Sequence, residues 1–172
     1  MNSGMVRRID ELGRIVIPKE IRKNLKLNMG DNVEIYVEDN KVTLKKYSSL
    51  IGLEEDLFNI AKVINELTND TILFSDLDDI IVSYGKLSEN YIDQNINTSL
   101  FDKLYHKAYL KANDLYLIDN HLENRNTYIF ALSNKNNIQG LFIVIENDIN
   151  ITSNYLETLM LFKKFINKQL EK

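Results

Sequence analysis

The sequence has no cysteine among its 172 residues and only two histidines. The absence of cysteine excludes disulfides, thiolate nucleophiles and zinc sites built on cysteine. The histidines, His106 and His121, are isolated in the sequence and form no His-x-x-x-His pair that could hold a metal. We therefore expect no metal site and no cofactor.

The sequence also lacks a run of ~18 apolar residues, which a membrane-spanning helix would need. Its first eight residues contain two arginines and no apolar signal core. These features predict a cytoplasmic protein that has no membrane partner. The 44% of hydrophobic and 27% of charged residues are typical of a globular protein.

The net charge of −4 is divided unevenly along the chain. Residues 1–47 hold ten basic and seven acidic residues and have a net charge of +3, whereas residues 48–172 have a net charge of −7. A small basic module joined to an acidic one suggests that only the first module meets a polyanion. A solvated surface is the alternative explanation for such an excess of charge.

The first 47 residues contain short segments of β-branched residues separated by turn residues. Gly13 suits a turn that needs positive φ, and Pro18, the only proline, suits the first position of a helix. Asp39 and Asn40 also tolerate positive φ and predict a tight hairpin turn. The pattern predicts one helix at 19–25 and four strands, at 5–9, 14–17, 33–37 and 42–45.

A module of this size cannot bury enough apolar surface to be stable alone. Its apolar residues need a second copy to cover them. An intertwined homodimer would provide that cover and would remove the open sheet edges.

The predicted helix has a basic face. At 100° per residue, Lys19, Arg22, Lys23 and Lys26 fall within a sector roughly 100° wide, and Ile21 and Leu25 fall on the opposite, buried side. Arginine suits phosphates and the acceptor edges of guanine, and lysine suits phosphates. The spacing is compatible with a DNA-binding surface, but equally with a solvated helix face.

The segment 4–22, GMVRRIDELGRIVIPKEIR, closely resembles the signature of AbrB-like transition-state regulators. The segments 30–37, GDNVEIYV, and 44–47, LKKY, fit the same family. The whole chain is similar to members that join such a module to a C-terminal GAF-like domain. The match extends over nearly all of residues 4–47.

This resemblance implies a swapped-hairpin β-barrel made by two chains and a role in transcription regulation, with a link to sporulation or other stationary-phase genes. It implies binding of double-stranded DNA through residues on the first turn, the strands beside it and the short helix. With the basic helix face, the expected DNA-binding residues are Arg7, Arg8, Arg14, Lys19, Arg22 and Lys23. The family also includes MazE-type antitoxins, so an antitoxin-like dimer that binds a protein toxin is the alternative.

The second half of the chain predicts an α+β domain with an antiparallel sheet between helices. We expect the DNA-binding domain at 1–47, a short linker at 48–52 and the second domain at 53–172. The expected helices are 53–68, 100–111 and a last helix capped by Thr152 or Ser153 that ends near Leu170. The expected strands are 71–74, 80–84, 115–118, 128–132 and 141–145, with a hairpin turn at 134–137.

The last helix is more apolar than one sheet face requires. Its large side chains are Tyr155, Leu156, Leu159, Met160, Phe162, Phe165, Ile166 and Leu170. We expect the first and last helices of this domain to pack against a second copy, which would make a homotetramer possible.

No residue of the second half is a candidate for catalysis, so the chain is not expected to be an enzyme. The sequence contains no Gly-rich phosphate loop and no Ser-x-x-Lys or Gly-x-Ser-x-Gly motif. The acidic run 75–79 is best explained as a hairpin turn. A small-molecule effector would lie near residues 85–119 in a GAF-like domain, but its ligand-binding residues are unknown, since Tyr91, Tyr105 and Tyr109 suit a core equally well.

Overall fold

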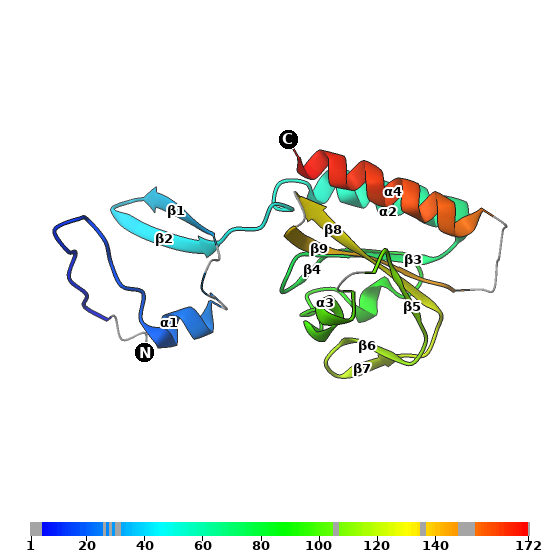
Figure 1. The fold of residues 1–172 in the computed structure, drawn as a ribbon, viewed down its shortest axis with the longest axis horizontal. Coiled ribbons are helices and arrows are strands. Elements are labelled where there is room, and N and C mark those ends of the chain that lie inside the picture. Colours follow the sequence, from blue (N-terminus) through cyan, green and yellow to red (C-terminus); the bar gives the residue numbers. More distant parts are fainter. Residues whose placement is uncertain are drawn as a thin grey trace. The chain divides into compact units, whose positions relative to one another are not determined.

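The computed structural model describes residues 5–25, 27, 29, 32–104, 107–134, 137–147 and 154–171. The chain divides into two compact units, Met1–Tyr47 and Ser48–Lys172 (Figure 1). In the described part of the chain, no helix has the length and apolar character needed to cross a membrane.

The N-terminal unit contains the helix α1 (Lys19–Asn24) and a hairpin of β1 (Val33–Glu38) and β2 (Lys41–Lys46). Asp39 and Asn40 form the turn, with φ of 46° and 61°. Positive φ at both central residues gives the backbone twist that suits a two-residue hairpin. The predicted hairpin and its turn are confirmed.

The predicted strands 5–9 and 14–17 are not formed as strands. The turn between them is present: Gly13 has φ of 75°, and its N–H donates to the Asp10 carbonyl at 2.9 Å. A strand requires a neighbour for its backbone hydrogen bonds, and no strand among the described residues pairs with these segments. Pro18 lies at the N-cap of α1, with ψ of 151°, one residue before the predicted position.

The C-terminal unit is built on a five-stranded antiparallel sheet in the order β4-β3-β9-β8-β5. Its strands are β3 (Thr71–Ser75), β4 (Ile80–Tyr84), β5 (Leu110–Ala112), β8 (Thr127–Asn134) and β9 (Asn137–Ile145). A separate hairpin pairs β6 (Leu115–Ile118) with β7 (His121–Glu123). This architecture confirms the α+β class.

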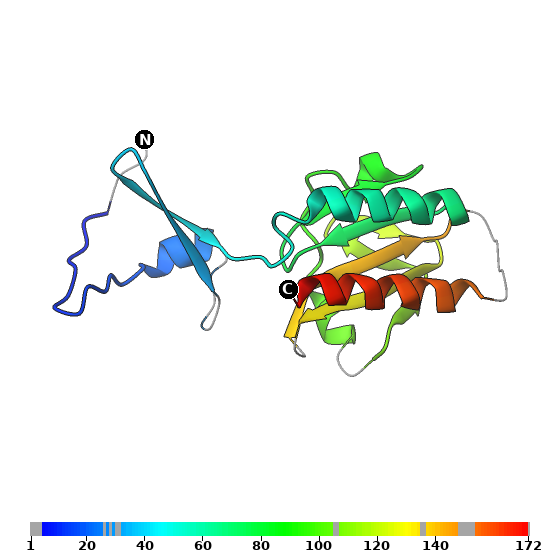
Figure 2. The same cartoon turned by 90° about the horizontal axis from the view of Figure 1, so that it is seen from above.

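Helices cover the sheet on both faces. The helices α2 (Glu54–Thr68) and α4 (Tyr155–Leu170) lie side by side and antiparallel over one face (Figures 1 and 2). The helix α3 (Ser99–Leu104) and the β6–β7 hairpin cover the other face, and a short 3-10 turn, Ser88–Asn90, follows β4. Each face therefore has a core of its own.

Alternate residues of the central strands supply these two cores. Phe74, Phe130 and Phe142 point toward α2 and α4, and their rings stack with centroids 5.2 and 5.3 Å apart. Leu73 and Ile143 point to the opposite core, which also contains α3 and the β6–β7 hairpin. Burial on both faces explains why these strands read as nearly continuous apolar segments.

One prediction for this unit, the helix at 100–111, is wrong. The helix expected at 100–111 is described only to Leu104, and Leu110–Ala112 forms β5, because it pairs with the edge of β8. Leu50, which lies in the segment 48–52 expected as a linker, is fully buried in the C-terminal unit. The strand β7 was not predicted, because it is only three residues long. Thr152 and Ser153 lie outside the described residues.

A buried polar cluster fixes the β6–β7 hairpin to the core. Tyr91 and Glu123 are almost completely buried, and the Tyr91 hydroxyl donates to Glu123 Oε2 at 2.7 Å. Burial disfavours the charged form of Glu123, but hydrogen bonds from Tyr91 and Arg125 outweigh it and lower its pKa. The carboxylate therefore stays ionised in the core and depends on its donors.

We expect Tyr91→Phe to lower the free energy of unfolding by about 1–3 kcal/mol, because a buried carboxylate loses a donor. Tyr116→Phe, at a half-exposed position on β6, is the control and should change it by less than about 0.5 kcal/mol. Urea denaturation of the full chain measures both. Equal small effects would show that the Tyr91 hydroxyl does not hold Glu123.

Candidate nucleic-acid interface

The turn at residues 10–13 is organised by one carboxylate. Oδ1 of Asp10 accepts from the backbone N–H groups of Leu12 at 3.0 Å and Arg14 at 2.8 Å. Oδ2 accepts from Nε of Arg14 at 2.8 Å. Aspartate commonly bonds to the backbone that follows it in this way, which rigidifies a turn.

Arg14 is held at the surface by this arrangement. Its ion pair with Asp10 uses Nε, and its side chain remains 71% exposed. A solvent-exposed pair of this kind contributes little stability, so its main effect is to orient the guanidinium. The orienting role of Asp10 was missed by the sequence reasoning, although an aspartate four residues before an arginine across a Gly turn was a visible signal.

Arg7 and Arg8 precede the turn in an exposed, extended segment. Nη2 of Arg7 lies 3.9 Å from Sδ of Met5, which is a weak contact. Within the described residues, neither arginine forms an ion pair. Both guanidinium groups are therefore available to an anion in solution.

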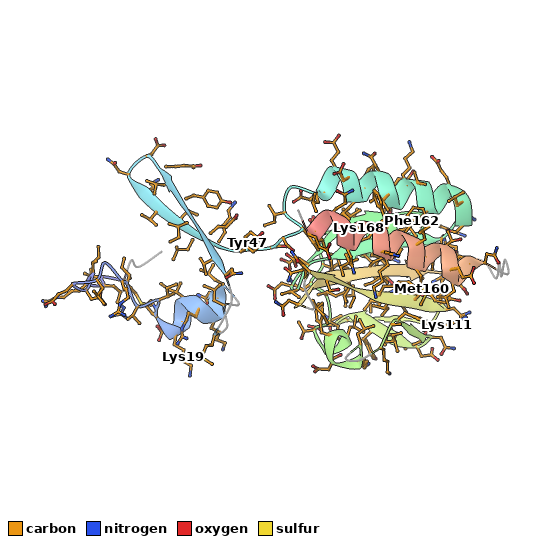
Figure 3. All side chains as sticks on the ribbon, turned by 45° about the horizontal axis from the view of Figure 1, so that its top comes forward. Lys19, Tyr47, Lys111, Met160, Phe162 and Lys168 are labelled. Carbon is orange, nitrogen blue, oxygen red and sulfur yellow. The ribbon has the colours of Figure 1, made fainter. Side chains whose placement is uncertain are left out.

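The helix α1 presents the other three predicted residues. Lys19, Arg22 and Lys23 are all exposed, and Figure 3 shows Lys19 pointing away from the β1–β2 hairpin. Ile21 is half-buried, while Leu25, expected on the buried side, is 37% exposed. Lys26 lies outside the described residues. The helix therefore keeps its cations in solvent but has little core beneath it in one chain.

The structure does not join the six predicted residues into a network of contacts. Of these six, only Arg14 forms an ion pair with a carboxylate of the described residues. The arrangement is a set of exposed cations on a small unit, and its chemistry is suited to electrostatic contact with a polyanion.

The acidic run in the C-terminal unit has a structural role. Oδ1 of Asp76 accepts from the backbone N–H groups of Asp78 and Asp79, both at 2.8 Å, and closes the β3–β4 turn. In the part of the chain that the structure describes, no group of three or more acidic or histidine side chains could hold a metal. His121 packs edge-on against the Tyr91 ring. His106 and Tyr105 lie outside the described residues.

A family model described as "Antidote-toxin recognition MazE, bacterial antitoxin" matches residues 6–51. The transition state regulatory protein AbrB of Bacillus subtilis (strain 168) is 54% identical over 46 residues, which are 27% of this chain and 48% of that protein. The N-terminal unit is a MazE/AbrB-type domain. The resemblance read from residues 4–47 is confirmed.

A second relative extends beyond the AbrB-type domain. Stage V sporulation protein T of B. subtilis (strain 168) is 39% identical over 99 residues, which are 57% of this chain and 56% of that protein. An alignment of this length includes part of the C-terminal unit. The chain thus spans about half the length of the curated relatives that it matches.

The AbrB-type domain is also similar in sequence to solved structures. The solution structure of the N-domain of the transcription factor abrB is 53% identical, covers 27% of this chain and 90% of that chain, and has a TM-score of 0.26. An RDC-refined solution structure of the N-terminal DNA recognition domain of B. subtilis AbrB is 54% identical and covers 27% and 87%, with a TM-score of 0.25.

The Asp10 carboxyl of the AbrB-type domain gives a pH-dependent signal. Hydrogen bonds from the backbone and then the side chain of Arg14 lower its pKa below the ordinary 3.8. The turn bonds are therefore complete above that value and are lost as the pH falls through the lowered pKa. We expect the Arg14 amide resonance in NMR to titrate with a midpoint below 3.8. The signal should disappear in Asp10→Asn, and a midpoint at or above 3.8 would contradict the bonding described.

Proposed function

We propose that this protein is a transcription regulator whose AbrB-type domain binds double-stranded DNA. The observation that carries the proposal is the 54% identity, over 46 residues, to a transition state regulatory protein. The likeness to a stage V sporulation protein favours genes of sporulation or stationary phase. Such a regulator would act in the cytoplasm, where bacterial DNA lies.

The proposal includes an intertwined dimer of the AbrB-type domain. In the described part of this unit only Pro18 and Leu27 are buried, whereas Val6 is 91% and Val16 is 79% exposed. Apolar surface of this extent is unfavourable in water. A second copy arranged as a swapped-hairpin barrel would cover it and would give the segments 5–9 and 14–17 their missing strand neighbours.

The proposed DNA contacts are the six exposed cations at the first turn and on α1. Arginine forks can reach base edges and phosphates, whereas the lysines neutralise phosphates. A twofold axis would double the set and place the two copies on one duplex. The full set is Arg7, Arg8, Arg14, Lys19, Arg22 and Lys23.

For the C-terminal unit we propose a GAF-like domain that oligomerises and senses a small ligand. An apolar groove of about 380 Å³, lined by Ile60, Leu161, Phe162 and Phe165, lies between α2 and α4. Phe165 is 50% exposed, and Figure 3 places Phe162 on α4. Docking of this face on a second copy would cover the groove and join two AbrB-type dimers into a tetramer.

The experiment that tests DNA binding is fluorescence anisotropy of the full chain with a duplex from its own upstream region, repeated at several salt concentrations. Counterion release predicts that the logarithm of the binding constant falls linearly with the logarithm of salt, with a slope of about −0.9 per phosphate neutralised. Absence of binding at low salt would refute the proposed function.

The second candidate function is an antitoxin-like dimer, favoured by the description of the matching family model. It predicts that a small toxin purifies with the chain in a fixed ratio. Against it, residues 48–172 form a compact unit with two buried cores, whereas a toxin-binding tail is typically disordered until it binds.

A further inference from the structure

The C-terminal unit has a second hollow, on the opposite flank of α4 from the apolar groove. It measures about 410 Å³ and lies between α4 and Ala108. Its lining combines lysines with apolar side chains, and consists of Ala108, Met160, Lys163, Lys164, Asn167, Lys168 and Glu171. The lining contains three lysines and one glutamate, although the unit as a whole carries a net charge of −7.

Lys163 is the unusual residue of this hollow. It is half-buried, and its Nζ donates to the Ala108 carbonyl at 3.2 Å. Burial lowers the pKa of its ammonium group. Within the described residues, none of the three lysines forms an ion pair, so the partly desolvated charge is not neutralised by the protein.

Lysines near the end of a helix are often explained by the helix dipole, whose C-terminal end is negative. That explanation suits Lys168, which lies in the last turn of α4. It does not suit Lys163, which lies seven residues before the helix end at Leu170 and bonds to a different segment of the chain. A half-buried cation without a counter-ion is costly unless an anion accompanies it.

We propose that this hollow binds a small organic anion, a carboxylate or phosphate carried on an apolar group. The anionic group would meet Lys163, Lys164 and Lys168, and Met160 and Ala108 would contact the apolar part. In Figure 3, Met160 and Lys168 both lie on α4. A hollow of this volume whose lining combines a few polar groups with apolar side chains is typical of small-molecule sites. This site is independent of the proposed DNA binding.

The test is an amide chemical-shift titration of the full chain with phenyl phosphate, with benzoate and with the neutral analogue phenol, in the absence of DNA. We expect saturable shifts centred on Ala108 and the α4 residues of the hollow for at least one anion, with a dissociation constant of about 1 mM for so small a probe. The two anions distinguish a phosphate site from a carboxylate site.

Two variants locate the binding. Lys163→Met keeps the length of the side chain and should weaken binding about tenfold, and Lys168→Met, at an exposed position, should weaken it without risk to folding. Lys62→Met, which removes an exposed lysine from α2, is the control and should leave binding unchanged. Equal binding of phenol, non-saturable shifts, or unchanged affinity in both hollow variants would overturn the proposal.

Discussion

Arg22→Ala should lower the affinity of the full chain for duplex DNA by roughly 1–3 kcal/mol, about 5- to 150-fold. Arg22 is exposed on α1, and it belongs to the basic face that we propose as the DNA-binding surface. Loss of a base contact would also relax the preference for one sequence over another. Fluorescence anisotropy at fixed salt, with the upstream duplex and with an unrelated one, measures both effects.

The control is Lys41→Ala, because Lys41 is an exposed cation of the same unit at the start of β2 and outside the proposed contacts. Both variants remove one positive charge, so any general electrostatic loss is common to them. If Lys41→Ala weakens binding as much as Arg22→Ala does, the affinity depends on net charge alone and the assignment of Arg22 fails.

Gly140→Ala should lower the free energy of unfolding of the C-terminal unit by about 3 kcal/mol. Gly140 lies in β9, and a Cβ atom there would stand 2.0 Å from the Ser75 carbonyl oxygen and 2.6 Å from Cδ1 of Leu50. The nearest atom belongs to the backbone of the neighbouring strand β3, so relief requires the sheet itself to move. Urea denaturation followed by circular dichroism measures the loss.

Gly52→Ala is the matched control. Gly52 has φ of 87°, but no atom lies within 4 Å of a Cβ built there. Its cost is backbone strain alone, about 1 kcal/mol. Equal stabilities of the two variants would show that the close approach of β9 to β3 and Leu50 is not a real constraint on the sequence.

The elements predicted well from the sequence are those specified by residues close together in the chain. The hairpin at Asp39 and Asn40 follows from two residues that tolerate positive φ. The helix α2 follows from apolar residues at helical spacing. The helix expected at 100–111 is wrong at Leu110–Ala112, because this segment pairs with β8, which lies almost twenty residues later in the chain. The spacing of apolar residues within one segment does not show which distant strand that segment will pair with.

The same reason explains the failure at 5–9 and 14–17. Their composition favours strands, but a strand requires a neighbour, and in the described part of the chain no strand pairs with them. The burial of Leu50 was also beyond a local pattern, because it depends on packing against β9.

The candidate site was partly predictable. The six cations could be named from their spacing and from the resemblance of residues 4–22, and the structure places all six on the surface. The orienting role of Asp10 was missed, although its position before Gly13 and Arg14 was a visible signal in the sequence. Its bonds to Leu12 and Arg14 show that it positions an arginine.

The most direct test is hydrogen–deuterium exchange of the full chain with and without an upstream duplex. We predict protection of backbone amides across residues 5–25, which hold the turn and α1, and little change in residues 48–171. Protection confined to the C-terminal unit, or no change in residues 5–25 at a concentration where the duplex is bound, would contradict the account.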